Sequence, residues 1–286
     1  MAEWSIVNPL DRDQLGEGPL WSARDGALYW VDILRQKLNR LRLGDGRMSS
    51  WSLPEMIGWV IERRHQPGFI AGLRSGFAEL RLDPFEVCVI ARPEPDRPGN
   101  RLNDAKADSA GRIYAGSMPV AADQPTGGFY RFDADRTITR LDDGYVIANG
   151  PAFSCDERYL FHTDSAQRTV FRYAVRGDGS LGERRSFIEF PQDWGQPDGM
   201  TVDANDHLWV AHWDGARVSR FAPDGSLQNS IALPTPQITS CTFAGPGLDR
   251  MFVTTAAVGR DGDVFAGKVF EVDPRTRGLA PNAFAG

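Results

Sequence analysis

Short runs in which apolar and polar residues alternate recur along the whole chain, and each run is bounded by Gly, Pro, Asp or Asn. Alternation with a period of two, rich in aromatic and β-branched residues, is typical of β-strands. Clear examples are found at residues 28–32, 112–116, 159–164, 207–211 and 251–254. Stretches with the period of a helix and with capping residues are absent. The pattern predicts an all-β fold.

One longer phrase repeats: a start rich in Gly or Pro, a short Asp/Gly turn, and then an aromatic-rich strand. The equivalent starting positions are separated by 42, 44, 46, 49 and 42 residues: Glu17, Trp59, Asn103, Asn149, Asp198 and Ser240. This is the spacing of four-stranded propeller blades. We therefore expect a six-bladed β-propeller, with four-stranded antiparallel blades around a central channel, as a single domain over residues 1–286. Residues 4–7 would join the last blade and close the ring, leaving no open sheet edge.

The composition changes this picture little but excludes some classes of function. The net charge is −6 and no like charges run for five or six residues, so we expect no nucleic-acid partner. No run of 18 apolar residues predicts a membrane helix, and the first residues lack the pattern of a signal peptide. The three cysteines suit a reducing compartment better than a disulfide framework. A cytoplasmic protein without a membrane partner is the expectation.

Polar residues at the starts of equivalent strands should converge on the channel. Here they are Glu17, Asn103, Asn149 and Asp198. Two carboxylates and an amide oxygen that meet in a channel are costly to bury without a partner, and a divalent cation removes that cost. Oxygen ligands favour calcium, magnesium or manganese, with zinc as a further candidate. Three protein ligands would leave positions for water and substrate, as catalysis requires.

Each of these residues also has an ordinary structural interpretation. Asn-Gly and Asp-Gly are common turn pairs, so Asn149 or Asp198 taken singly would be interpreted as a turn former. Their shared position in the repeats is what favours a site. For Asp32 and Asp164, a turn or a hydrogen bond that links blades is the favoured interpretation.

Two histidines occupy strand positions near the channel, His162 and His212. Contact with a substrate and simple packing are about equally supported for both. The cysteines are better explained as buried residues than as nucleophiles. No GxSxG, P-loop or GxGxxG motif is present, which argues against a serine hydrolase, an NTPase or a dinucleotide-binding enzyme.

Six short phrases follow one another at blade spacing: residues 15–19 (LGEGP), 101–104 (RLND), 149–151 (NGP), 162–165 (HTDS), 197–200 (PDGM) and 239–241 (TSC). With all six in order, the chain resembles the SMP-30/gluconolactonase/regucalcin-like family almost end to end. The resemblance implies a six-bladed propeller with one divalent metal ion held by Glu17, Asn149 and Asp198. It also implies that Arg101 and Asn103 contact the substrate. Family members typically hydrolyse sugar lactones to aldonic acids, which makes a gluconolactone-like or pentonolactone substrate the expectation.

The chemistry of these residues suits a hydrolase that acts on carboxylic ester bonds. The metal would polarise the lactone carbonyl and lower the pKa of a bound water, with Asp198 as general base. Arg101 would bind sugar hydroxyls or the ring oxygen through its planar fork, and Asn103 would hold a hydroxyl or a water.

The sequence departs from the family pattern at two places. Some relatives carry an acidic substrate contact just after the phrase at 116–118, but here Pro119, Val120 and Ala121 follow, with no carboxylate before Asp123. Ala105 also stands where relatives often have Gly. Recognition of a sugar on that side of the site is therefore an open question.

Other functions also remain open. They are a calcium-binding regulatory propeller with little turnover, a promiscuous metal-dependent esterase or phosphotriesterase, and an interaction scaffold with an idle channel. Two carboxylates and one amide suit a site with exchangeable water better than a closed calcium site.

Overall fold

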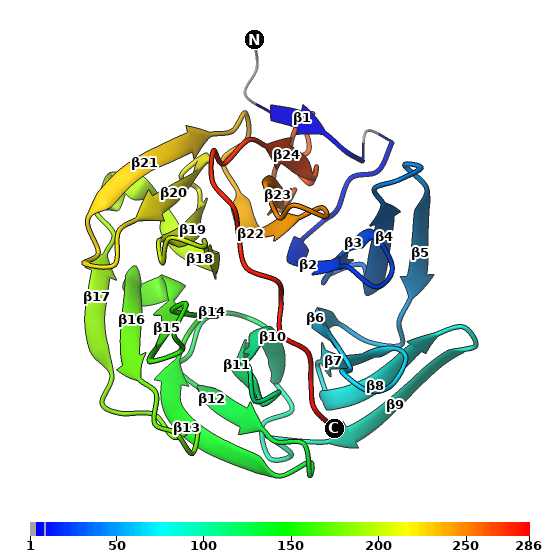
Figure 1. Ribbon diagram of the computed structural model, residues 1–286, viewed down its shortest axis with the longest axis vertical. Helices are drawn as coiled ribbons and strands as arrows, with labels where there is room; N and C mark the ends of the chain where they lie inside the picture. Colours follow the sequence, from blue (N-terminus) through cyan, green and yellow to red (C-terminus); the bar gives the residue numbers. More distant parts are fainter. Residues whose placement is uncertain (1–3, 9) are drawn as a thin grey trace.

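The computed structural model describes residues 4–8 and 10–286, which form six four-stranded antiparallel sheets arranged in a ring (Figure 1). The predicted six-bladed propeller is confirmed. Each blade begins with an inner strand and ends with an outer one, because consecutive strands pair in chain order. The six inner strands are β2, β6, β10, β14, β18 and β22, and they surround the centre of the ring.

The strands have the following bounds. Blade 1 holds β2 (Gly16–Ser22), β3 (Ala27–Asp32), β4 (Lys37–Arg42) and β5 (Met48–Ser52), and blade 2 holds β6 (Ile57–Glu62), β7 (Phe69–Leu73), β8 (Gly76–Leu82) and β9 (Phe85–Ala91). Blade 3 holds β10 (Asn100–Ala107), β11 (Ile113–Pro119), β12 (Gly127–Phe132) and β13 (Ile138–Tyr145), and blade 4 holds β14 (Ala148–Phe153), β15 (Tyr159–Asp164), β16 (Thr169–Ala174) and β17 (Arg185–Glu189). Blade 5 holds β18 (Gln196–Val202), β19 (Leu208–Trp213), β20 (Arg217–Phe221) and β21 (Leu227–Ala232), and blade 6 holds β22 (Ile238–Ala244), β23 (Arg250–Thr255), β24 (Phe270–Val272) and β1 (Trp4–Ile6). Two short 3-10 helices lie at Ser165–Gln167 and Gln192–Trp194. Among the residues that the structure describes, no helix is long and apolar enough to cross a bilayer.

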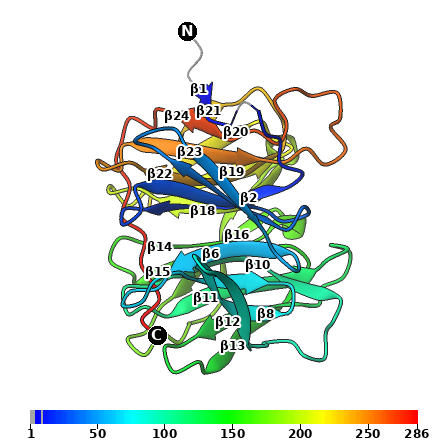
Figure 2. The ribbon, with the colours of Figure 1, turned by 90° about the vertical axis from the view of Figure 1, so that its right-hand side faces the viewer.

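The first strand of the chain completes the last blade, as predicted. In β1, Trp4 pairs with Val272 and Ile6 with Phe270, so the N-terminal segment lies beside β24 (Figures 1 and 2). Residues from both ends of the chain thus build one sheet, which closes the ring and pairs the edge of β24.

Neighbouring blades pack through aromatic side chains. Tyr29 of blade 1 meets Phe69 of blade 2 at 5.0 Å between ring centroids, and Phe77 of blade 2 stacks on Phe132 of blade 3 at 4.4 Å. These residues are almost completely buried. The aromatic strand positions in the repeat are therefore the core of the molecule, and they leave the polar starting positions for the channel.

Every inner strand has an irregularity near its start. The register with the second strand shifts after Glu17 in β2, after Leu102 in β10, after Asn149 in β14 and after Pro197 in β18, with equivalent shifts in β6 and β22. A bulge of this kind turns a side chain away from the regular pleat and is frequent beside active sites. The six bulges therefore lie at the same depth of the ring, where the repeat places its polar residues.

The C-terminal segment runs across the centre of the ring, from blade 6 towards blade 2 (Figure 1). It lies on the face opposite to the bulged starts of the inner strands. The backbone of Gly278 bonds to Leu248, and that of Phe284 bonds to Glu62 (2.8 Å each). Because these contacts lie at the far ends of the inner strands, the bulged starts of the strands face the other mouth.

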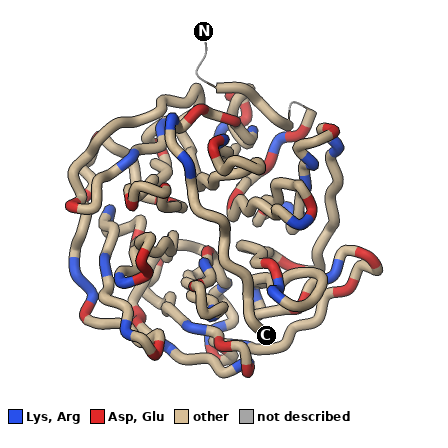
Figure 3. The backbone as a smooth tube through the Cα atoms, in the orientation of Figure 1, with Lys and Arg blue, Asp and Glu red and all other residues tan. Residues whose placement is uncertain are grey.

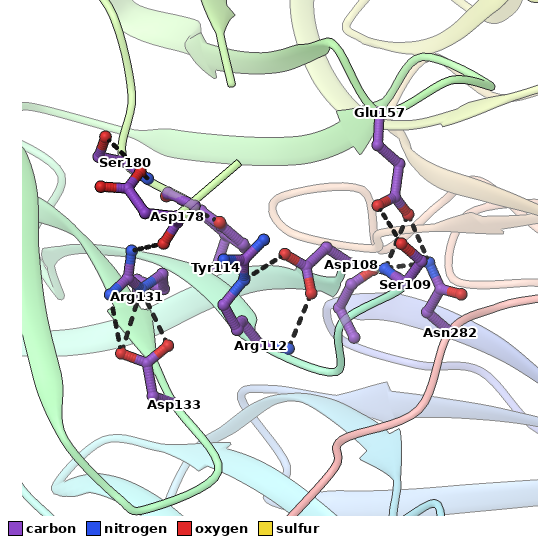
Figure 4. A network of polar contacts seen from close by, with 12 residues as sticks. Asp108, Ser109, Arg112, Tyr114, Arg131, Asp133, Glu157, Asp178, Ser180 and Asn282 are labelled. Atoms are coloured by element: carbon purple, nitrogen blue, oxygen red, sulfur yellow. Dashed lines mark hydrogen bonds and ion pairs between the residues drawn. The ribbon is translucent and has the colours of Figure 1, made fainter. Parts of the chain in front are cut away.

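Polar contacts join blades 3 and 4 to this segment (Figure 4). The hydroxyl of Tyr114 donates to the carbonyl oxygen of Gly179 at 2.9 Å, which links the two blades. Asn282 of the C-terminal segment donates to Glu157 at 3.0 Å, and Ser109 donates to the same carboxylate. Elsewhere around the ring, Lys and Arg are interspersed with Asp and Glu (Figure 3), and many of them pair locally.

We expect Phe284→Ala to destabilise the propeller by about 3 kcal/mol, the usual cost of truncating a buried Phe. Phe284 is 2% exposed and stacks on Phe132 at 5.3 Å. Urea unfolding of the variant beside Leu279→Ala, a residue 44% exposed on the same segment, would measure the difference. A loss no larger than that of the control would mean that the packing of Phe284 contributes little to the stability of the propeller.

Candidate active site

Five of the residues singled out in the sequence line one cavity of about 290 Å³: Glu17, Arg101, Asn103, Asn149 and Asp198. They come from the inner strands of blades 1, 3, 4 and 5, and all five are buried, with side chains at most 7% exposed. The structure therefore brings together residues that are up to 181 positions apart in the chain. We call these five residues the polar set.

Glycines beside the polar set let the inner strands turn and approach each other. Gly18 and Gly150 have φ of 54° and 69°, which favours glycine. A Cβ at Gly18 would lie 2.7 Å from the carbonyl oxygen of Gly58 in the next blade. The Gly that follows Glu17 and Asn149 in the sequence is therefore needed to place those two side chains.

A chain of hydrogen bonds that spans three blades fixes three members of the polar set, Arg101, Asn103 and Asn149. Arg101 donates to Asn103 Oδ1 at 2.5 Å, and Asn103 Nδ2 donates to Asn149 Oδ1 at 2.7 Å. Asn149 Nδ2 in turn donates to Ser165 Oγ at 2.8 Å, and this hydroxyl donates to the carbonyl oxygen of Pro197 at 2.6 Å. Ser165 was not among the predicted site residues, although the phrase at 162–165 contains it. These hydrogen bonds use one lone pair of Asn149 Oδ1 and leave the other available, since an amide oxygen has two.

Burial and mutual repulsion disturb the carboxyl groups of the site. Burial raises the pKa of Glu17 to about 8, and the charge of Asp104 adds to this effect. Burial and the charges of Glu17 and Asp104 raise the pKa of Asp198 well above its usual range. Burial also raises the pKa of Asp104 to about 6. The charge of Arg101 opposes the rise in pKa of Glu17 and Asp198, while burial lowers the pKa of Arg101 itself to about 10.

Three members of the polar set, Glu17, Asn149 and Asp198, fit a divalent cation. Asp198 Oδ1 is buried and has no hydrogen-bond partner in the structure, which is costly for a carboxylate unless a ligand completes it. Glu17 Oε2 accepts a hydrogen bond from the backbone N–H of its neighbour Gly18 at 3.0 Å. In the described part of the chain, no three His, Cys, Asp or Glu side chains are placed to bind a metal together. A metal at this position would thus depend on the amide oxygen of Asn149 as its third protein ligand.

The chain is similar to known proteins over almost its whole length. Residues 15–257 match the SMP-30/Gluconolactonase/LRE-like region. The chain is a member of this family. It is 35% identical over 278 residues to the 6-deoxy-6-sulfogluconolactonase of Pseudomonas putida (95% of each chain covered), and 37% identical over 283 residues to the L-arabinolactonase of Azospirillum brasilense (96% of this chain and 93% of the relative). Among solved structures, a calcium-binding protein, regucalcin, from Agrobacterium tumefaciens superposes with a TM-score of 0.92 at 26% identity (98% and 96% covered).

The two histidines predicted as substrate contacts do not line the cavity in this family member. His162 is fully buried between blades, stacked on Phe129 at 3.9 Å and edge-on to Tyr145 at 4.8 Å. His212 is also fully buried, and its Nδ1–H donates to the carbonyl oxygen of Trp194 at 2.7 Å. Both lie on the second strand of a blade among aromatic side chains, so the geometry favours packing, the second of the two interpretations.

Two other acidic candidates are also structural. Asp32 accepts bonds from the backbone N–H groups of Gln14 (2.8 Å) and Leu15 (3.2 Å). Asp164 accepts bonds from residues 146 and 147 in the same manner. The hydrogen-bonding interpretation of these two residues is confirmed, and each one anchors the segment that leads into an inner strand.

The buried histidines should make the protein less stable in acid. Burial lowers the pKa of His162 to about 3 and that of His212 to about 4. As the pH falls below 6.5, the unfolded chain binds protons at these residues before the folded chain does, so the free energy of unfolding falls by up to about 1.4 kcal/mol per pH unit for each histidine. Urea unfolding of His162→Leu between pH 6.5 and 5 should show a flatter pH dependence than the unmodified chain. The exposed His65→Gln is the control, and equal slopes for all three proteins would contradict this prediction.

Proposed function

We propose that this chain is a divalent-metal-dependent lactonase that hydrolyses the ester bond of a sugar lactone to the aldonic acid. The observation that carries the proposal is the convergence of two buried carboxylates and an amide oxygen on one cavity, with Asp198 Oδ1 lacking a partner. Family membership and the lactonase names of two relatives support the same reaction class.

In this proposal Glu17, Asn149 and Asp198 hold the cation, which is calcium, magnesium, manganese or zinc. Oxygen ligands suit the first three metals, and a calcium-binding relative of known structure supports calcium. When bound, the ion supplies Lewis-acid stabilisation of the negative charge that develops on the ester carbonyl oxygen, worth several kcal/mol.

Asp198 is proposed as the general base. One oxygen of its carboxylate would hold the cation, and the other would accept the proton. Asp198 would take a proton from the attacking water, whose oxygen adds to the carbonyl carbon. The acyl–oxygen bond of the ring then breaks, the ring oxygen takes up the proton from Asp198, and the product is a hydroxy acid that ionises.

Arg101 and Asn103 are proposed to position the substrate. Asn103 Oδ1 and the carbonyl oxygen of Leu102 hold one end of the Arg101 guanidinium. The remaining N–H groups of the planar fork are then available for the ring oxygen or a hydroxyl of the lactone. Asn103 couples this fork to Asn149, so a shift of either residue would move the other.

A pH-indicator assay tests the proposal. Metal-stripped protein is mixed with five- and six-carbon aldonolactones, alone and with calcium, magnesium, manganese or zinc, and spontaneous ring opening is subtracted. We expect acid release that depends on one or more of the metals. Release from aryl esters or phosphotriesters alone would replace the lactonase with the esterase alternative. Calcium binding without release from any substrate would favour the regulatory alternative.

A further inference from the structure

The same cavity has a second lining, which is apolar. Nine apolar side chains complete it: Leu15, Leu34, Met56, Met118, Val120, Ala122, Ile147, Trp213 and Val258. We call these residues the apolar wall. All six blades contribute to it, and Leu34 and Val120, each 39% exposed, lie where the cavity opens to solvent.

The polar set of the cavity lies on inner strands, whereas most of the apolar lining residues lie in the segments before and between strands. Apart from the polar set, only Ser165 and Gln196 among the lining residues carry polar side chains. Ser165 already bonds to Asn149 and to the carbonyl oxygen of Pro197. Gln196 and the indole N–H of Trp213 are thus the only further side-chain partners that the described lining residues offer to a hydroxyl group.

The strand that follows Arg101 extends this apolar character. Met118 in β11 pairs directly with Arg101 in β10, so a thioether lies beside the guanidinium. Val120 follows, and Asp123, the first carboxylate after it, is not part of the cavity lining. A sugar arm that extends past Arg101 on this side would meet Met118 and Val120.

The energetics favour an apolar group there. A hydroxyl that leaves water for an apolar wall loses its hydrogen bonds without replacement. A methyl or longer alkyl group in the same place gains from the burial of apolar surface. The cavity as a whole therefore suits a ligand with a polar ester end and an apolar arm.

We propose that the preferred substrate is a lactone whose arm remote from the ester bond is apolar, such as a deoxysugar lactone, rather than a fully hydroxylated one. This inference rests on the proposed lactonase function and specifies its substrate class. The polar set binds the ester end, and the apolar wall binds the arm.

The test compares matched lactones that differ by one hydroxyl. The sugar lactone that the enzyme hydrolyses fastest is compared with its counterpart in which the terminal CH₂OH is replaced by CH₃, as in galactono-1,4-lactone and fucono-1,4-lactone. We expect kcat/KM to be about 10- to 100-fold higher for the deoxy lactone, the range over which a hydrophobic pocket discriminates against an added hydroxyl. Equal values, or a preference for the hydroxylated lactone, would overturn the proposal.

Variants of the wall locate the effect. Leu34→Asn and Val120→Thr add a polar group at the opening with little change of volume, and each should reduce the preference for the deoxy lactone several-fold. Leu227→Asn is the matched control, since Leu227 is 43% exposed on β21 of blade 5 and does not line the cavity. If the preference persists unchanged in both wall variants, the apolar wall does not determine it. Absence of metal-dependent release from every lactone is a different result, which would refute the lactonase function itself.

Discussion

Asp198→Asn is expected to lower kcat/KM by about 10³-fold or more while the propeller remains folded. The substitution removes the proposed general base, which alone typically contributes 10²- to 10⁴-fold, together with a charged ligand of the cation. An amide at this position keeps the size of the side chain but neither accepts a proton nor carries a charge. Steady-state hydrolysis of the best lactone, at a saturating metal concentration, measures the loss.

The same variant should be at least as stable as the unmodified chain when metal is removed. Asp198 is buried beside Glu17 and Asp104, and its Oδ1 has no partner, so its charge opposes folding in the absence of a cation. Thermal unfolding in chelator would measure this. Asp96→Asn, an exposed carboxylate outside the cavity, is the control for both measurements. Near-normal activity of Asp198→Asn would remove this residue from the proposed mechanism, and loss of the fold would show that its role is structural.

Removal of the metal should abolish hydrolysis and lower the melting temperature. A cation that binds only the folded chain stabilises it by about 2.7 kcal/mol at 100 times its dissociation constant, which corresponds to a shift of roughly 5 °C or more for a protein of this size. Differential scanning calorimetry of the chelated protein, with each metal added back, measures this shift without reference to activity.

The metal-dependent shift should require the proposed ligands. Glu17→Gln and Asn149→Ala should each reduce it, because each removes one of only three protein ligands. Asp96→Asn should leave it unchanged. A shift of full size in both ligand variants would mean that the stabilising metal binds elsewhere on the chain.

The sequence was sufficient to predict the ring and four members of the polar set, because both follow from one repeated phrase, whereas Arg101 came from the family resemblance. Each copy of the phrase places an apolar aromatic strand in the core and a polar residue at the start of an inner strand. The distance between copies is the length of a four-stranded blade, and the six copies predict six blades. Glu17, Asn149 and Asp198 could therefore be brought together without any coordinates.

The repeated phrase did not predict which way the side chains of the two histidines face. His162 and His212 are close in sequence to channel residues, but they lie on second strands, where the facing of a side chain depends on the register with the inner strand. The bulges after Asn149 and Pro197 set that register. The sequence carries no direct signal for them beyond a Gly or Pro nearby.

The apolar wall was likewise invisible in the sequence. Leu34, Val120 and Ile147 belong to turns and segments between strands, outside the repeated phrase. Their shared position emerges only when six blades place their connecting segments around one opening. The absence of a carboxylate directly after Met118, by contrast, is evident from the sequence. In the structure, Val120 lines the cavity at this place.

The central claim is that Glu17, Asn149 and Asp198 together hold one divalent cation in the channel. The most direct test is anomalous X-ray diffraction from crystals grown with manganese, since an anomalous peak locates the ion independently of activity. The account predicts one strong peak within coordination distance of a side-chain oxygen from each of the three residues. A channel without such a peak, or a peak held by other residues, would contradict it.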